Sequence, residues 1–66
     1  MMKAIRTYSV QLEADLARIA LEGADIPAVV VGVGIGYTGI GGVQLLVPED
    51  RIDAAQQVLE KLEEPG

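Results

Sequence analysis

Residues 28–47 read AVVVGVGIGYTGIGGVQLLV, two aliphatic runs that flank a segment, 32–42, holding six of the chain's eight glycines. Residues 34–39, GIGYTG, have the GxGxxG spacing of a dinucleotide-binding turn. In such a turn the glycines lead straight into a helix, whose N-terminal amides hold the pyrophosphate. Here VQLLV follows at 43–47, and this pattern is typical of a strand. The stretch therefore predicts a glycine-rich connection between two strands rather than a Rossmann-type nucleotide site.

The segment before this stretch predicts a strand followed by a helix. Residues 3–8, KAIRTY, alternate weakly, which favours a strand. A helix is expected from Val10 to about Gly23, with the Ser9 hydroxyl as its N-cap. Gly23 is expected at the C′ position, and Pro27 prevents any continuation of the helix. The residues at helical spacing that we expect to face the core are Leu12, Leu16 and Ile19, with Ala20 beside them.

The segment after it predicts a second helix. Pro48 ends the strand, and Glu49 and Asp50 place acidic side chains in the first turn of the helix, where the helix dipole favours them. Its apolar stripe is formed by Ile52, Ala55, Leu59 and Leu62, and its solvent-facing residues are expected to be Gln56, Gln57, Glu60 and Lys61. Residues 63–66 are expected to form a frayed tail.

The predicted order of elements is β-α-β-β-α, within a single domain that spans residues 1–66. Right-handed crossover between the first two strands leaves the third strand to insert antiparallel between them. The expected fold class is α+β: a ferredoxin-like (PII-like) sandwich that lacks the last strand, with a three-stranded antiparallel sheet and two helices on one face.

Composition excludes several functions. The chain has 66 residues, no cysteine and no histidine, so thiolate chemistry and Cys/His zinc sites are excluded. Its net charge of −5 opposes binding to nucleic acid and to anionic membranes. No apolar run approaches the roughly 20 residues of a membrane span, and we expect a cytoplasmic protein. We expect no enzymatic activity, because acid–base catalysis needs a titratable group held in a cleft and a domain this small offers little cleft. We also expect no cofactor.

Several short motifs resemble one family. They are Glu13-Ala14-x-Leu16, Leu21-Glu22, Ile26-Pro27-Ala28, Leu46-Val47-Pro48-Glu49-Asp50 and Ala54-Ala55 with Leu59. From Lys3 to Leu62 the chain is similar to the small bacterial domains of unknown function labelled putative prokaryotic signal-transducing proteins. The resemblance implies a PII-like or ferredoxin-like fold. It implies no particular activity, because the family's function is itself unassigned.

The glycine-rich stretch has two interpretations. In the first it is only a connection, and Tyr37 folds back over Ile35 or Ile40. In the second, glycine amides near the start of the first helix bind a small anion, with Arg6 or Lys61 reaching the site. The candidate ligand-binding residues are Gly34, Gly36, Tyr37, Thr38 and Gly39, together with Ser9 and Arg6.

The two aliphatic runs also predict an interface. Val30 points opposite to Val29 and Val31, and Leu45 points opposite to Leu46, so both faces of the sheet are apolar. Whichever face the helices cover, an apolar side chain remains on the other. The candidate interface residues are Val30, Leu46, Ile35 and Ile40. The expected partner is a second copy, giving a dimer through the bare face or the edge of the first strand, or else another protein.

The sequence thus favours a non-catalytic interaction or regulatory module that self-associates. The alternative is a small-ligand sensor that binds an anionic metabolite or nucleotide at the glycine-rich stretch. A third class, an enzyme subunit whose site a partner completes, has no candidate residue.

Overall fold

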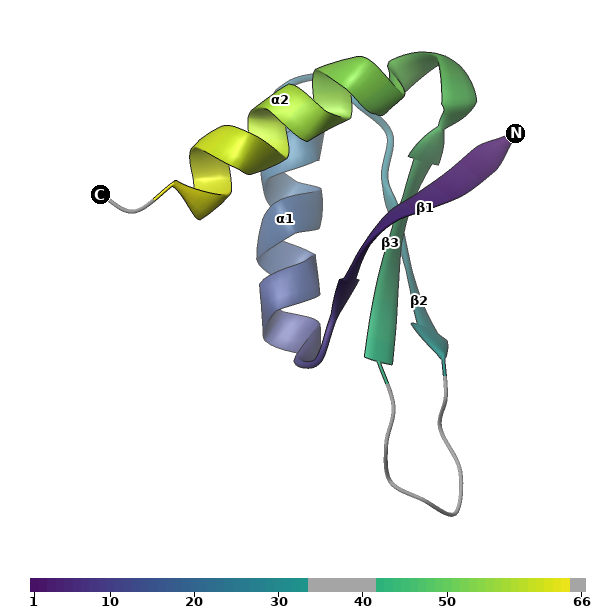
Figure 1. Cartoon of the computed structure of the whole chain (residues 1–66), viewed down its shortest axis with the longest axis vertical. Helices are drawn as coiled ribbons and strands as arrows, with labels where there is room; N and C mark the ends of the chain where they lie inside the picture. Colours follow the sequence, from purple (N-terminus) through teal and green to yellow (C-terminus); the bar gives the residue numbers. More distant parts are fainter. Residues whose placement is uncertain (34–41, 65–66) are drawn as a thin grey trace.

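The computed structural model describes residues 1–33 and 42–64 of the chain (Figure 1). The elements in chain order are β1 (Met2–Tyr8), α1 (Gln11–Gly23), β2 (Val29–Val33), β3 (Gly42–Pro48), a 3₁₀ turn η1 (Glu49–Arg51) and α2 (Ile52–Glu63). The sheet has the order β1-β3-β2, and β3 pairs antiparallel with both neighbours. The predicted α+β class, the β-α-β-β-α order and the central position of the third strand are confirmed.

Both helices cover the same face of the sheet, and the core lies between them and β3. Leu45 and Val47 of β3 are fully buried against Ala17 and Leu21 of α1 and against Ala55 and Leu59 of α2. Figure 1 shows the two helices on one side of the strands, with α2 lying across the C-terminal part of α1. Alanine at three of the buried helical positions, Ala14, Ala17 and Ala55, lets these layers approach closely. The resulting core is small and almost entirely aliphatic.

The prediction of which face of α1 is buried is wrong. Its buried residues are Ala14, Ala17 and Leu21, whereas the expected stripe is more than half exposed, with Leu12 at 65%, Leu16 at 53% and Ile19 at 56%. Both sets have helical spacing, so periodicity alone could not choose between them. The small residues face inward because α1 must fit against both β3 and α2. Large side chains at Ala14 and Ala17 would hold the helix away from the sheet.

The ends of α1 also differ from expectation. The N-cap residue is Val10 rather than Ser9, and no side-chain hydrogen bond caps this end. At the C-terminus, the amide of Ile26 donates to Leu21 O at 2.9 Å and that of Asp25 donates to Glu22 O at 3.0 Å. This is the Schellman pattern, in which the C′ residue takes a left-handed conformation. That residue is Asp25, with φ of 63°, and Gly23 is instead the last residue of the helix.

A register shift in β1 brings two consecutive side chains to the helix-covered side. The pairing of β1 with β3 is irregular between Ala4 and Arg6, as at a β-bulge. Ile5 packs against the core, and the next residue, Arg6, contacts α2. In a regular strand these two side chains would point to opposite faces. The bulge is therefore what allows β1 to contribute both an apolar and a charged group to the helical layer.

Candidate functional site

Most of the predicted ligand site lies outside the described residues. Gly34, Gly36, Tyr37, Thr38 and Gly39 belong to the segment 34–41, as do the interface candidates Ile35 and Ile40. The strand ends beside this segment are described. Tyr8 of β1 pairs with Val43, which pairs in turn with Gly32 of β2, so the end of β1 and the end of β2 lie at the same pole of the sheet. The start of α1 lies at this pole as well (Figure 1).

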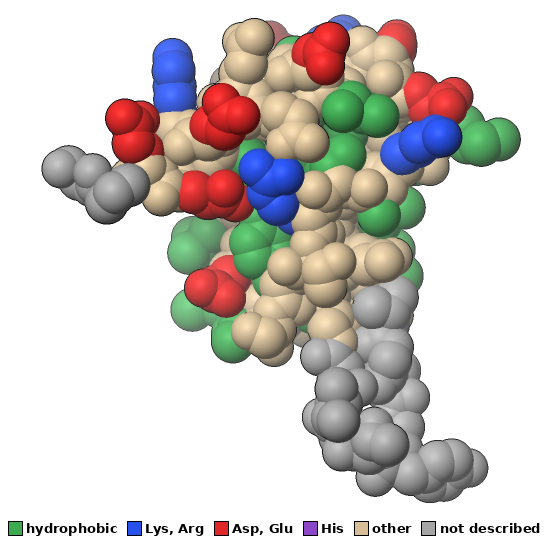
Figure 2. All heavy atoms as spheres, viewed as in Figure 1, with side chains coloured by type: hydrophobic (Ala, Val, Ile, Leu, Met, Phe, Trp, Pro, Cys, Tyr) green, Lys and Arg blue, Asp and Glu red, His purple; other side chains and the backbone are tan. Residues whose placement is uncertain are grey.

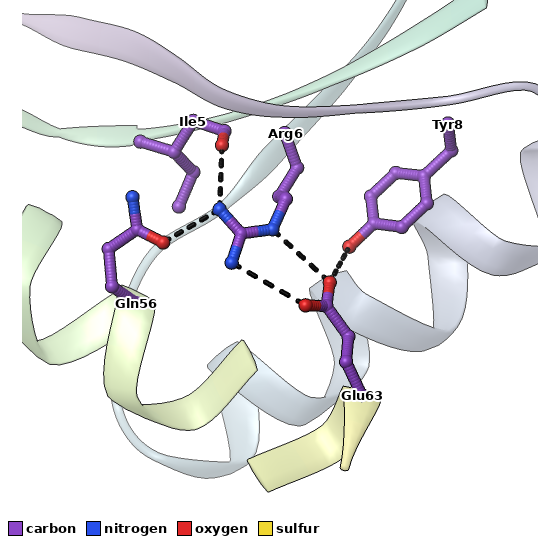
Figure 3. Close-up of polar contacts among 5 residues, drawn as sticks. All are labelled: Ile5, Arg6, Tyr8, Gln56 and Glu63. Carbon is purple, nitrogen blue, oxygen red and sulfur yellow. Dashed lines mark hydrogen bonds and ion pairs between the residues drawn. The ribbon is translucent and has the colours of Figure 1, made fainter. Parts of the chain in front are cut away.

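Of the two remaining candidates for the ligand site, Ser9 is exposed and Arg6 is engaged in a polar cluster on the helix side (Figure 3). The Arg6 Nη1 donates to Gln56 Oε1 at 2.7 Å and to the carbonyl of Ile5 at 3.0 Å. Its Nε donates to Glu63 Oε2 at 3.2 Å, which joins β1 to the last residue of α2. A ligand that used Arg6 would have to compete with Glu63.

Tyr8 completes this cluster, and its pKa is shifted. Its hydroxyl donates to Glu63 Oε2 at 3.5 Å. Partial burial raises the pKa of Tyr8 above its ordinary value of 10.0, and the negative charge of Glu63 raises this pKa further, while Arg6 opposes the shift. The shift moves the phenol away from neutral pH, so Tyr8 is not poised for proton transfer there. The hydrogen bonds of this cluster link β1 to α2, through Arg6 and Tyr8 on the strand and Gln56 and Glu63 on the helix.

The other side of the sheet carries no helix, and we call it the open face. Val30 packs against the core with Leu45, so it lies on the covered side and leaves the set of interface candidates. Leu46 lies on the open face, in one cross-strand row between Ala4 and Val29. Alternation places the following described residues on this face: Met2, Ala4, Thr7, Val29, Val31, Gln44 and Leu46. Val29 and Val31 are 45% and 41% exposed.

A second apolar surface lies on the outer side of α1. It consists of Leu12, Leu16 and Ile19, and we call it the outer row. Figure 2 shows hydrophobic side chains on two opposite sides of the molecule, over α1 on the left and over the strands on the right. Sequence reasoning assigned the outer row to the core, so it missed this surface. The i, i+4, i+7 spacing of the outer row is visible in the sequence. Only the burial of Ala14 and Ala17 shows that the outer row faces away from the core.

None of the described helices is long and apolar enough to span a bilayer. Nor do the described residues contain a group of three acidic, histidine or cysteine side chains suited to hold a metal ion. The described residues expose apolar side chains on two opposite sides of the domain, the open face and the outer row. This arrangement is that of a small two-layer α+β domain.

Comparison with known families then identifies the group. Residues 2–63 of the chain match the family described as putative prokaryotic signal transducing protein, and the chain belongs to this family. The match confirms the resemblance inferred from the short motifs. No curated protein and no solved structure matches the chain.

Proposed function

We propose that this protein is a non-catalytic interaction module that self-associates through its open face. The observation that carries this proposal is the row formed by Ala4, Leu46 and Val29 across all three strands. A strand with one face in water normally alternates apolar with polar residues, so that its water-facing side chains are polar. Val29 and Val31 break that rule, because both are apolar and both lie on the open face. An apolar surface of this kind on a small domain is typical of an interface.

Charge favours a second copy as the occupant. None of the described residues of the open face is charged, although the chain carries a net charge of −5. Two open faces can therefore pack together, at the usual spacing of about 10 Å between sheets, without placing like charges in contact. The remaining repulsion acts between the acidic surfaces outside the interface. Because salt screens such repulsion, association should become stronger as ionic strength rises.

The size of the core gives a second reason for association. A domain of 66 residues with a small aliphatic core is close to the lower limit for stability without a disulfide or a metal. Burying the open face in a dimer would add apolar contact at about 25 cal/mol for each Å² removed from water. Dimer formation and folding stability are therefore expected to rise together with protein concentration.

Analytical ultracentrifugation of matched variants tests this proposal. Val31→Asp and Leu46→Asp place a charge on the open face and should convert the dimer to a monomer. Leu12→Asp introduces the same charge on the opposite side of the molecule and should leave the dimer intact. Circular dichroism confirms that each variant is folded. A parent protein that stays strictly monomeric at tens of micromolar in high salt would refute the proposal.

The outer row of α1 favours a second partner of different chemistry. Glu13 and Asp15 lie on either side of the row and form no ion pair with any described residue, while Arg18 is engaged with Glu22 at 2.8 Å. This acidic border complements a basic amphipathic helix, which would lay an apolar stripe against Leu12, Leu16 and Ile19. The protein would then hold a second copy on one side and a cationic partner on the other.

A designed helical peptide that carries leucine on one face and lysine on the other is the probe for this second surface. Its glutamate counterpart, with the same leucines, is the control for charge. We expect the lysine peptide alone to shift the amide resonances of α1, and we expect Leu16→Asp to weaken this binding while Val31→Asp does not. Equal binding of both peptides, or binding unaffected by Leu16→Asp, would count against the second surface.

A further inference from the structure

A hollow of about 240 Å³ lies between α2 and the turn that follows α1. Its apolar lining residues are Ala24, Ile26, Ala54 and Val58. Its polar lining comes from α2 and the turn that precedes it: Arg51, Gln57 and Lys61. None of its lining residues belongs to the open face or to the outer row. We call it the α2 groove.

The two cations of this groove differ from the other three in the chain. Lys3 pairs with Glu49 at 3.5 Å, Arg6 with Glu63 and Arg18 with Glu22. Arg51 and Lys61 form no ion pair with any described residue. All ten Asp and Glu side chains are among the described residues, so no acidic side chain of the chain pairs with these two cations in this structure. Although the protein has a net charge of −5, the two basic side chains without an acidic partner both line this one hollow.

A neighbouring hollow on the other side of Ile26 has the opposite charge. It has a volume of about 220 Å³ and is lined by Glu22, Asp25 and Pro27 as well as Ile26. The two hollows share a buried isoleucine but present cations on one side and carboxylates on the other. An anion is therefore directed to the α2 groove and repelled from its neighbour.

The spacing of the two cations limits the shape of a ligand. Arg51 and Lys61 are ten positions apart, which corresponds to about 15 Å along a helix axis. Along α2 and the turn before it they are the first and the last of the lining residues, with Ala54, Gln57 and Val58 between them in the chain. One compact anion cannot sit close to both cations unless both side chains bend toward the middle. An elongated molecule with an anionic group at each end can contact both without distortion.

We propose that the α2 groove binds an elongated organic dianion, with two carboxylate groups joined by an apolar chain. The Arg51 guanidinium is suited to hold one carboxylate by two parallel hydrogen bonds, and the Lys61 ammonium pairs with the other as a point charge. The apolar chain lies over Ile26, Ala54 and Val58, and the Gln57 amide is available at the side. This proposal does not depend on self-association through the open face.

Titration with straight-chain dicarboxylates of increasing length, followed by amide chemical shifts, tests the proposal. We expect saturable shifts at Ala24, Ile26, Ala54 and Val58, with the affinity highest at one intermediate length that spans the two cations. A monocarboxylate of the same length should bind at least tenfold more weakly, because it leaves one cation without a partner. Inorganic phosphate, which is compact, should behave like the monocarboxylate.

Three variants separate this site from general attraction of anions. Arg51→Gln and Lys61→Gln should each weaken the best dicarboxylate at least tenfold and remove the preference for its length. Arg18→Gln removes a cation that lies outside the groove and should leave the affinity unchanged. All three positions are at the surface, so folded variants are expected, and circular dichroism confirms this. Affinity independent of chain length, equal loss in all three variants, or no shift at tens of millimolar would overturn the proposal.

Discussion

Glu63, the last residue of α2, accepts a hydrogen bond from Arg6 of β1, with Arg6 Nε and Glu63 Oε2 3.2 Å apart. The sequence placed Glu63 in a frayed tail and Gln56 on a solvent-facing surface. Instead, both side chains hold the guanidinium of Arg6 (Figure 3). The contact joins residues 57 positions apart in the chain, and it fixes the end of α2 over the sheet.

Arg6 should matter more to stability than the exposed ion pair on α1. We expect Arg6→Gln to lower the free energy of unfolding by about 1–2 kcal/mol, because it removes charge-assisted hydrogen bonds to two α2 side chains and leaves Glu63 unpaired. Arg18→Gln removes an exposed i,i+4 pair and should cost at most about 0.5 kcal/mol. Urea unfolding of the two variants measures the difference. An equal loss of unfolding free energy in the two variants would show that the Arg6 cluster does not stabilise the contact of α2 with the sheet.

Stability should fall at high pH through Tyr8. Because the pKa of Tyr8 is raised in the folded state above its ordinary 10.0, the folded protein retains the phenolic proton at a pH where the unfolded chain has lost it. The stabilisation is therefore complete below pH 10.0 and is lost as the pH rises toward the folded pKa. Tyr8→Phe should make unfolding less dependent on pH in this range.

The pKa itself is measured by phenolate absorbance in a Tyr37→Phe background, where Tyr8 is the only tyrosine. Adding Glu63→Gln should lower the pKa of Tyr8, since it removes a negative charge and leaves Arg6 to favour the phenolate. A pKa of Tyr8 unchanged by Glu63→Gln would mean that Glu63 does not act on the phenol.

The orientation of α1 makes a prediction that separates its two apolar stripes. Leu21→Ala opens a cavity in the core and should cost about 2–5 kcal/mol. Leu16→Ala changes a side chain that is 53% exposed and should alter the stability of the monomer by no more than about 0.5 kcal/mol. Both effects are measured by thermal unfolding at low protein concentration. A larger loss of stability for Leu16→Ala than for Leu21→Ala would show that the stripe expected from periodicity is the buried one.

For Gly23→Ala at the end of α1, the structure predicts a gain in stability, whereas the sequence-based assignment of Gly23 to C′ predicts a loss. Gly23 is helical and an added Cβ meets nothing within 4 Å, so Gly23→Ala should stabilise the protein by about 0.5–1 kcal/mol. A glycine at C′ would have a positive φ, and alanine there would destabilise. That position belongs to Asp25, and Asp25→Ala should cost about 1 kcal/mol. Chemical denaturation of the two variants decides between these assignments.

Local pattern was sufficient to predict the elements and their order. The β-branched run before the glycines, the strand-like VQLLV after them and Pro48 at its end each carry a short-range preference that the fold keeps. The handedness rule for crossovers then fixed the sheet order, because it limits how two strands and a helix can connect. These predictions depend on backbone preferences and short connections, which a sequence displays directly.

The surfaces required the tertiary structure. Val30 and Leu46 were equivalent candidates for the bare side of the sheet until the packing of Leu45 and Val47 against both helices showed which face is covered. Likewise, two apolar stripes of α1 had the same period, and the fit of its alanines against β3 and α2 selected one of them. Periodicity reports that a face is apolar, but not what packs against it.

By itself, then, the sequence determined the α+β class, the strand order and the membership of a family, because these follow from local preferences and chain connectivity. Only the tertiary structure decided which apolar side chains face solvent, that Glu63 meets Arg6 and that Arg51 and Lys61 line one groove. Each of these depends on contacts between segments distant in the chain. Such contacts are selected by packing and charge in three dimensions, and no short stretch of sequence contains them.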